Sequence, residues 1–310
     1  MPTRAGLVAL IGAPNAGKST LFNRLTGAKL SIVTPKPQTT RFRIRGVVVA
    51  TTEGGDQAEI VLMDLPGIFV PRRGLDRAMV AEAWHAAAEA DVALLLADAS
   101  AEENPALGRI AEQLAAACRA IWLVINKIDL VARPSLLGLS ARLNTMAPFQ
   151  RTFMLSAATG DGVADLLAAL GPAMPEGPHL YPPEQISDLS ERLLAAELVR
   201  EQVFLQSHDE VPYATTVETE SWEERKDGSV RNAATITVAR PGQKAILIGA
   251  GGVRIRTIGA RARAALTAAL ARTVHLVLRV DVAAGWDEDK RRLGALGLRA
   301  RSLEAERRKA

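Results

Sequence analysis

Residues 6–20 read GLVALIGAPNAGKST, and this stretch decides the fold of the first half of the chain. The apolar run 6–12 ends in glycine and predicts a short buried strand, whereas the residues from Lys18 to Leu25 have a helical pattern. Between them, residues 12–19 match the spacing GxxxxGK[ST]. A loop of this kind between a strand and a helix presents successive backbone N–H groups to phosphates, and the helix N-terminus adds partial positive charge.

The same loop predicts a set of phosphate and metal contacts. Lys18 is expected to reach the β- and γ-phosphates of a nucleotide and to act in catalysis, and the Ser19 hydroxyl is expected to ligate Mg²⁺. The residues expected to contact the nucleotide here are Asn15, Ala16, Gly17, Lys18, Ser19 and Thr20.

Further apolar runs follow at 44–50, 59–63, 92–97, 121–125 and 152–155, with helix-compatible stretches such as 75–90 and 104–119 between them. Alternation of buried strands and helices predicts an α/β domain with a mostly parallel sheet and helices on both faces. Residues 1–170 are assigned to this domain.

Three short motifs follow strands of this sheet, in the order DxxG, NKxD and SAA. Asp64, with Gly67 three residues on, is expected to hold Mg²⁺ through a water, and the Gly67 N–H to contact the γ-phosphate. In residues 126–129, the Asp129 carboxylate can accept two hydrogen bonds from guanine but finds no matching donors on adenine. The remaining base contacts are expected from Asn126, Lys127, Ser156, Ala157 and Ala158.

The segment 29–41 separates the phosphate loop from DxxG and contains two adjacent threonines. A threonine in such a loop can ligate Mg²⁺ and contact the γ-phosphate, so that the loop orders with GTP and relaxes after hydrolysis. Thr40 is the first choice for this role and Thr39 the second. The position after Gly67 is Ile68, which cannot orient an attacking water as glutamine does, so intrinsic hydrolysis is expected to be slow.

Residues 171–183 contain five of the sixteen prolines, which predicts a linker over 171–186. The pattern then becomes a helix over 187–206, two strands at about 214–224 and 232–239, a short apolar run 245–248, a glycine loop, a helix over 253–272 and a strand over 274–282. This order indicates a smaller α+β domain within residues 187–310.

Positive charge is concentrated in this second domain. Residues 231–280 contain nine Lys or Arg and no Asp or Glu, which suits a polyanionic partner. Residues 249–252 (GAGG), expected between a strand and a helix, match the GxxG loop of KH domains, which clamps the backbone of single-stranded nucleic acid. Contacts to RNA are expected from Lys244, Gly249, Ala250, Gly251, Gly252, Arg254 and Arg256.

Composition sets broad limits on the class of protein. The chain has 310 residues, 48% hydrophobic and 23% charged, with a net charge of +4 and one cysteine, Cys118. A single cysteine rules out an intramolecular disulfide, and the N-terminal apolar run is too short for a membrane span. We expect a cytoplasmic protein; a monomer is expected because nothing indicates an obligate oligomer.

Taken together, the motifs resemble the Era family of bacterial GTPases. The resemblance rests on GAPNAGKST, QTTRFRI, DLPG, NKID, SAATG, YPPEQISD, VPY, RPGQKAILIGAGG and GWDEDKRRLGALG, which cover nearly the whole chain. It implies a P-loop GTPase domain followed by a type II KH domain, with GTP or GDP and Mg²⁺ as ligands. It also implies 16S ribosomal RNA and the small ribosomal subunit as partners, and peripheral contact with the inner membrane in some members. With Ile68, the chain also resembles GTPases that carry a hydrophobic residue at this position. Members with asparagine at the position of Asn15 often use K⁺ near the phosphates, so Asn15 is a candidate K⁺ ligand.

Two positions depart from the family pattern. Leu65 stands where members usually have threonine, at a position that contributes mainly backbone, so little change is expected. Ala250 stands where members usually have lysine inside the GxxG loop, so one phosphate contact is expected to be missing.

Other classes of protein share parts of this pattern. A tRNA-modification GTPase shares NAGKS and TTR but usually ends with a catalytic cysteine, whereas this chain ends ERRKA. A double-GTPase assembly factor would need a second phosphate loop. An RNA-binding adaptor with a purely structural nucleotide site does not require the intact Lys18, Ser19 and Asp64. The favoured mechanism is a switch in which GTP orders 29–41 and changes the posture of the KH domain across the linker.

Overall fold

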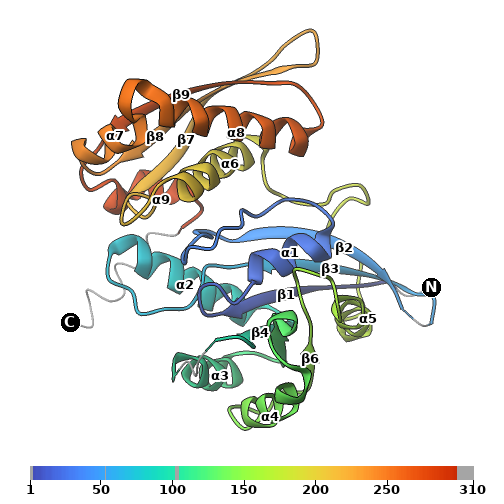
Figure 1. Ribbon diagram of the computed structural model, residues 1–310. Coiled ribbons are helices and arrows are strands. Elements are labelled where there is room, and N and C mark those ends of the chain that lie inside the picture. Colours follow the sequence, from blue (N-terminus) through green and yellow to red (C-terminus); the bar gives the residue numbers. More distant parts are fainter. Residues whose placement is uncertain (1–2, 53, 102–104, 299–310) are drawn as a thin grey trace. The chain divides into compact units, whose positions relative to one another are not determined.

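In a computed structural model of the chain, residues 3–52, 54–101 and 105–298 are described. They form two compact units (Figure 1). The first unit contains the described residues up to Ser31, then Thr40–Asp188 and the residues from Leu296 on. The second contains Leu189–Ala295 together with the short segment Ile32–Thr39.

A six-stranded sheet forms the centre of the first unit, with strand order β2-β3-β1-β4-β5-β6. All neighbours are parallel except β2, which runs antiparallel to β3. The strands are β1 (Arg4–Gly12), β2 (Ile44–Thr51), β3 (Gln57–Asp64), β4 (Val92–Asp98), β5 (Ile121–Asn126) and β6 (Arg151–Met154). The predicted α/β class with a mostly parallel sheet is confirmed.

Helices cover the two faces of this sheet because successive strand residues alternate between them. One face carries the large apolar cluster in which Ile11, Leu95 and Leu123 meet side chains of α2 (Gly74–Glu89) and α3 (Pro105–Ala117). Leu143 of α4 (Arg133–Asn144) packs into the same cluster. The opposite face of β2 and β3 is covered by α1 (Lys18–Thr26) and α5 (Val163–Ala173) (Figure 1).

The proline-rich stretch is in part helical, which the sequence did not predict. Helix α5 continues through Gly171 and Pro172 to Ala173. Pro172 lies in the last turn, where its missing N–H costs one helical hydrogen bond rather than interrupting the helix. The residues beyond follow the first unit, because the Ala5 N–H donates to the Pro175 carbonyl at 3.1 Å and the Val47 N–H to the Ile186 carbonyl at 2.9 Å.

The second unit begins with α6 (Glu191–Gln206), whose first turn is capped by the Ser190 hydroxyl accepting from the Leu193 N–H. A three-stranded sheet follows in the order β7-β8-β9, with β7 and β8 antiparallel and β8 and β9 parallel. Its elements are β7 (Thr215–Glu224), β8 (Val230–Val238), α7 (Pro241–Ile248), η2 (Ala250–Gly252), α8 (Val253–Leu270), β9 (Val274–Val282), η3 (Trp286–Glu288) and α9 (Lys290–Ala295). Val199, Ile236 and Ile258 lie in its apolar core. The predicted KH domain is confirmed.

The segment before the glycine loop is a helix, so the prediction that GxxG lies between a strand and a helix is wrong. Helix α7 starts at Pro241, whose fixed φ suits the first helical position. The side chain of Gln243 accepts from the backbone N–H of Arg240 at 3.0 Å and caps the first turn. The apolar run 245–248 is too short to show whether its residues follow the helical or the strand spacing. Pro241, which is typical of the first position of a helix, was the informative residue.

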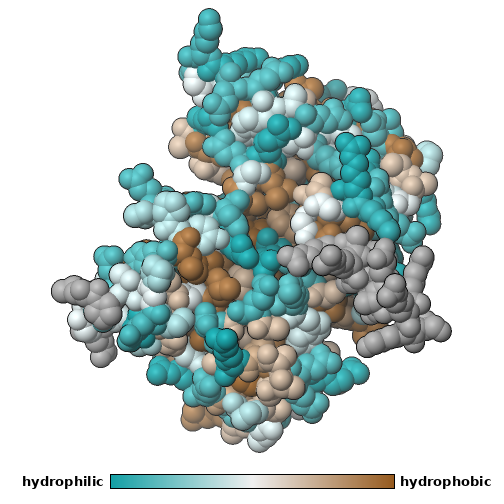
Figure 2. All heavy atoms as spheres, turned by 180° about the vertical axis from the view of Figure 1, so that it is seen from behind, coloured by the Kyte–Doolittle hydropathy of each residue, from teal (hydrophilic) through white to brown (hydrophobic). Residues whose placement is uncertain are grey.

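Hydrophilic side chains predominate on the face of the molecule seen in Figure 2. None of the helices within the described ranges is long and apolar enough to cross a membrane.

Candidate nucleotide-binding site and nucleic-acid interface

The predicted phosphate loop joins the end of β1 to the start of α1, at the edge of the sheet where parallel strands end. Gly17 has φ of 90°, and a Cβ atom built on it would lie 2.2 Å from Nδ2 of Asn126. Any side chain at this position would therefore displace the Asn126 amide. Asn15 also has positive φ, at 63°, as a residue type that tolerates the left-handed region.

Lys18 is buried and bends back over the loop. Its Nζ donates to the carbonyls of Gly12 at 3.2 Å and Ala13 at 2.9 Å. Burial lowers the pKa of Lys18 from its ordinary value to about 8, while the nearby Asp64 carboxylate opposes the shift. Phosphate oxygens would meet an ammonium group that is already confined to the loop.

Three hydroxyl groups converge on the carboxylate of Asp64 at the end of β3. Its Oδ2 accepts from Ser31 Oγ at 2.6 Å, Ser19 Oγ at 2.7 Å and Thr40 Oγ1 at 3.2 Å. Its Oδ1 is buried and has no hydrogen-bond partner. Burial raises the pKa of Asp64, although the three hydroxyls and Lys18 oppose the shift. Oxygen donors around an unpartnered carboxylate oxygen are a donor set that fits Mg²⁺.

Thr40, rather than Thr39, faces this cluster. Thr40 Oγ1 lies 2.9 Å from Ser19 Oγ, within the set of oxygens around Asp64. The Thr39 hydroxyl instead donates to the Lys36 carbonyl at 2.8 Å and lies 2.7 Å from the Thr34 hydroxyl. Ser31 was not predicted. No motif marks this serine, and only the fold brings it to Asp64.

The segment after Asp64 packs tightly against the phosphate loop. A Cβ atom on Gly67 would lie 2.8 Å from the Pro14 nitrogen, so a side chain there would separate the two loops. The Ile68 N–H donates to the Gly12 carbonyl at 3.0 Å, and the Ile68 side chain packs in the apolar cluster beside α2. Leu65 is fully buried in that cluster, so its side chain contributes packing in addition to the backbone contribution expected at this position.

The NKxD residues connect three loops. Asn126 Nδ2 donates to the Ala16 carbonyl at 2.8 Å, and its Oδ1 accepts from the Ala157 N–H at 2.9 Å. One buried amide therefore holds the phosphate loop against the 156–158 loop. Asp129 lies in η1 (Ile128–Leu130) with its side chain exposed, where its carboxylate can meet a base from solvent.

Lys127 is held by Asp98, a residue that belongs to none of the four motifs. Its Nζ lies 2.5 Å from Oδ2 of Asp98 at the end of β4. The Ser100 N–H and hydroxyl also donate to Asp98, at 2.9 and 2.7 Å. These bonds hold the pKa of Asp98 below its ordinary value even though partial burial opposes them. In the sequence, the only indication of this role was that Asp98 is a carboxylate at the end of an expected strand.

The 156–158 loop is tied back to α1. Arg24 donates from Nε to the Ala157 carbonyl at 3.2 Å and from Nη2 to the Ala158 carbonyl. Within the loop, the Ser156 hydroxyl accepts from the Thr159 N–H at 3.1 Å. Thr20 lies in the first turn of α1, directly after Ser19.

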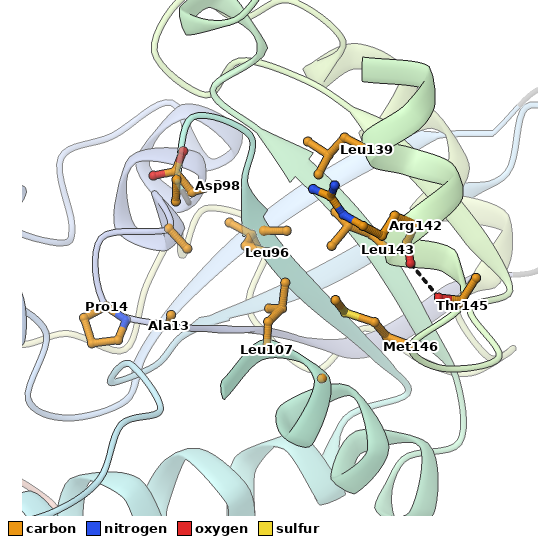
Figure 3. A pocket seen from close by; sticks show the side chains of 14 residues that line it. Ala13, Pro14, Leu96, Asp98, Leu107, Leu139, Arg142, Leu143, Thr145 and Met146 are labelled. Carbon is orange, nitrogen blue, oxygen red and sulfur yellow. Dashed lines mark hydrogen bonds between the residues drawn. The ribbon is translucent and has the colours of Figure 1, made fainter. Parts of the chain in front are cut away.

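A pocket of about 470 Å³ adjoins the phosphate loop between the end of β4, α3 and α4. Figure 3 shows Leu96, Leu107 and Leu143 around it, with Arg142 and Thr145 at one side, where the Thr145 hydroxyl donates to the Arg142 carbonyl at 2.7 Å. Its lining includes Ala13 and Pro14 but none of the NKxD or SAA residues. This mostly apolar pocket is therefore not the predicted base site.

The pKa of Lys18 predicts how nucleotide affinity depends on pH. Bound phosphates favour the ammonium form, so the free protein must take up a proton when its Lys18 is neutral. The charged fraction falls as pH rises through about 8. GDP affinity measured by fluorescence titration should therefore fall about fourfold between pH 7 and 8.5.

Lys18→Arg provides the control, because arginine stays charged throughout this range. Its affinity, although lower at every pH, should not change with pH. The same slope in the variant and the original protein would show that the pH dependence does not come from Lys18.

The predicted GxxG loop lies between α7 and α8. Gly249, Gly251 and Gly252 all have positive φ, whereas Ala250 does not and is exposed. Arg254 donates from Nη1 to the Ile246 carbonyl at 2.9 Å, which ties α8 to the end of α7. Arg254 is therefore engaged in holding the loop, whereas Arg256 is exposed.

The helix that follows this loop, α8, forms an open groove of about 290 Å³ with β9, the edge strand of the sheet. Its lining combines apolar and cationic side chains, namely Ile255, Arg256, Gly259, Ala260, Arg263, Leu276 and Leu278. Arginines can contact phosphates here while the apolar residues contact bases. Arg263 was counted among the nine cations of 231–280 but was not assigned to a site. Leu276 and Leu278 were missed because only the fold brings β9 beside α8.

The basic stretch 231–280 is partly neutralised by acids outside it. Arg231 lies 3.4 Å from Glu223, Arg279 2.6 Å from Asp281, and Arg272 pairs with Glu191 and, at 3.5 Å, with Glu224. Three of the nine cations that the sequence analysis counted therefore have carboxylate partners. The other six cations belong to α7, its N-cap or α8: Arg240, Lys244, Arg254, Arg256, Arg261 and Arg263.

Fold and site together define a P-loop GTPase followed by a KH domain. The family model described as 50S ribosome-binding GTPase matches residues 7–127, and the KH domain model matches residues 210–287. The chain is 52% identical to GTPase Era of Afipia carboxidovorans over 297 residues, which cover 96% of this chain and 95% of that protein. The chain belongs to the Era family of GTPases.

Other comparisons agree with this assignment. GTPase Era of Sinorhizobium medicae is 51% identical over 298 residues, covering 96% of this chain and 94% of that protein. The crystal structure of Era in complex with MgGDPNP and nucleotides 1506–1542 of 16S ribosomal RNA matches with a TM-score of 0.89 at 34% identity, over 96% of this chain and 99% of that one. An Aquifex aeolicus Era variant bound to GDP and AlF₄⁻ matches equally well, over 95% of this chain and 99% of that one.

Proposed function

We propose that this GTPase is a switch that binds the 3′ region of 16S ribosomal RNA through its KH domain and assists assembly of the small ribosomal subunit. The observation that carries the nucleotide part is the convergence of Ser19, Ser31 and Thr40 on Asp64, whose Oδ1 is buried without a partner. The RNA part is supported by the groove between α8 and β9 and by the relatives of this chain.

The nucleotide would bind with its phosphates in the loop 12–19 and its base between Lys127 and the 156–158 loop. Lys18 would bind the β- and γ-phosphates, and the Gly67 N–H would contact the γ-phosphate. Ser19, Thr40 and Asp64 would hold Mg²⁺, directly or through water, and this ion would neutralise charge developing on the phosphates. Asn15 is the proposed ligand for K⁺.

Guanine selection would come from Asp129, whose exposed carboxylate can accept from the ring N–H and the exocyclic amine. Lys127 would cover one face of the base, with Asp98 fixing its ammonium group. Asn126 would keep the two loops at a constant separation, because its amide bonds both of them.

In the KH domain, Lys244, Arg256 and Arg263 would meet phosphates, and the backbone of the 249–252 loop would approach the RNA closely. The single-stranded RNA would follow the groove between α8 and β9. The protein would act as a monomer in the cytoplasm. Peripheral contact with the inner membrane would be an additional property, which the family resemblance implies for some members.

A direct test measures binding of a short single-stranded RNA copying the 3′ end of 16S ribosomal RNA, together with phosphate release from GTP. The proposal predicts RNA binding well above that of a scrambled sequence and GTP turnover that needs Mg²⁺. Binding no tighter than to the scrambled RNA would contradict the RNA part alone. Absence of GTP turnover would contradict the enzymatic part.

Ala250→Lys is expected to tighten RNA binding and to steepen its dependence on salt, because the lysine adds one phosphate contact. Ala250 is exposed with an ordinary negative φ, so the loop can accept the longer side chain. RNA affinity should be compared at two salt concentrations by fluorescence anisotropy. Lys226, exposed in the β7–β8 turn, offers a control in Lys226→Ala. An unchanged affinity and salt slope in Ala250→Lys would contradict the prediction.

A further inference from the structure

The segment 32–39, which lies inside the predicted nucleotide-sensitive loop, packs with the second unit rather than the first. Ile32 is buried in an apolar cluster with Leu194 and Leu198 of α6. The Val33 N–H donates to Glu201 Oε1 at 3.0 Å. Lys36 Nζ donates to the carbonyls of Phe204, at 2.5 Å, and Ser207 at the end of α6. A cation is favoured at these carbonyls because they lie at the negative end of the helix dipole.

Arg200 is the most deeply buried polar link between α6 and this segment. It is 1% exposed, and its Nη2 donates to the Thr39 carbonyl at 2.6 Å. Its Nε donates to Glu197 Oε1 at 2.7 Å, and its guanidinium lies 5.3 Å from the centre of the Phe204 ring. Nη1 is buried without a hydrogen-bond partner.

This ion pair is a costly way to fill a helix interface. Removing two charges from water carries a penalty that their attraction often fails to recover, and an unsatisfied donor adds to it. Apolar side chains of similar volume would pack there without that cost. What the arginine provides, and an apolar residue cannot, is a fixed hydrogen bond to the Thr39 carbonyl.

The residues directly flanking the segment reach the candidate metal site. One peptide bond after Thr39, the Thr40 hydroxyl lies 3.2 Å from Asp64 Oδ2. One peptide bond before Ile32, the Ser31 hydroxyl lies 2.6 Å from the same atom. The backbone conformation at Thr39 therefore determines where the Thr40 hydroxyl can point.

We propose that Arg200 is a positioning residue that, by holding the Thr39 carbonyl, keeps the Thr40 hydroxyl at the Mg²⁺ site and so favours GTP over GDP. GDP has no γ-phosphate for this segment to contact. The affinity for GDP therefore does not depend on the hydrogen bond between Arg200 and Thr39. Nucleotide preference is thereby made to depend on a helix of the RNA-binding unit. The inference rests on the proposed binding of GTP with Mg²⁺.

Two changes remove the anchor in different ways. Arg200→Met combined with Glu197→Gln removes both buried charges while keeping the volume. Lys36→Met removes the contact at the end of α6 from a half-buried side chain, so it leaves the core intact. The matched control is Arg192→Ala, an arginine on the same helix whose Nη2 bonds the carbonyls of Thr219 and Glu220.

The experiment measures the affinities of the full chain for GDP and for a non-hydrolysable GTP analogue, each with Mg²⁺ and with EDTA. Both changes should weaken binding of the analogue with Mg²⁺ by about tenfold or more, the effect of losing one charged hydrogen bond. GDP binding should stay within about twofold, as should both affinities of Arg192→Ala.

An equal loss for both nucleotides would show a merely structural role and would overturn the proposal, and so would no loss for either. If the double variant fails to fold in a thermal unfolding assay, Lys36→Met decides the question alone. The unchanged protein in the same titrations tests the proposed GTP binding separately, because failure there would appear before any substitution.

Discussion

Lys18→Ala is expected to reduce GTP turnover by about 100- to 1,000-fold, the cost of removing one preorganised group from a transition state with developing charge. Lys18 Nζ already lies over the phosphate loop, held by the carbonyls of Gly12 and Ala13. Alanine removes the ammonium group that would contact the β- and γ-phosphates. Phosphate release should be measured at saturating GTP, so that weaker binding is separated from slower chemistry.

The control for this variant is Lys226→Ala, which removes an exposed lysine in the β7–β8 turn. Its turnover should match that of the unchanged protein. If Lys18→Ala kept more than a tenth of the original rate at saturation, the phosphate loop would not be the catalytic site. The adaptor hypothesis, in which the nucleotide is only structural, would then regain support.

Asp129→Asn is expected to weaken GTP binding by about 100-fold or more and to strengthen binding of xanthosine triphosphate. The amide N–H₂ of asparagine would face the donor groups of guanine, which leaves hydrogen bonds unmade. Xanthine carries a carbonyl in place of the exocyclic amine and can accept from that amide. Competition titrations with both nucleotides measure the change in preference.

Asp165→Asn is the matched control, because Asp165 is an exposed aspartate in the first turn of α5. Its preference should remain that of the unchanged protein. Equal losses for both nucleotides in Asp129→Asn would mean that the substitution disturbs the loop rather than base recognition.

Much of the nucleotide site could be predicted because its motifs are local and each follows a strand. The parallel sheet brings Gly12, Asp64 and Asn126 to one edge, so the order of the motifs along the chain was sufficient to group them. The family and the fold class, predicted from the same motifs, are confirmed.

The contacts that the sequence did not reveal join residues without motif signals. Ser31 reaches Asp64 across 33 residues, and Asp98 reaches Lys127 across 29. Local sequence patterns also led to wrong predictions where they fitted two kinds of secondary structure. The run before GxxG belongs to a helix started by Pro241, and Pro172 was accommodated in a last helical turn.

The second unit shows the limit of charge counting. The stretch 231–280 contains no acid, yet Arg231, Arg272 and Arg279 pair with carboxylates on other elements. Pairing across strands depends on register, which composition does not contain. The packing of 32–39 on α6 was equally invisible, because no pattern links Thr39 with Arg200.

Coupling between nucleotide state and RNA binding can be measured in one titration. The affinity for the 3′-end RNA of 16S ribosomal RNA should be measured with GDP and then with the non-hydrolysable GTP analogue, at one fixed salt concentration. We predict two different dissociation constants, and linkage requires that the RNA shift the preference between the two nucleotides by the same factor. Equal dissociation constants in the two states would contradict the switch.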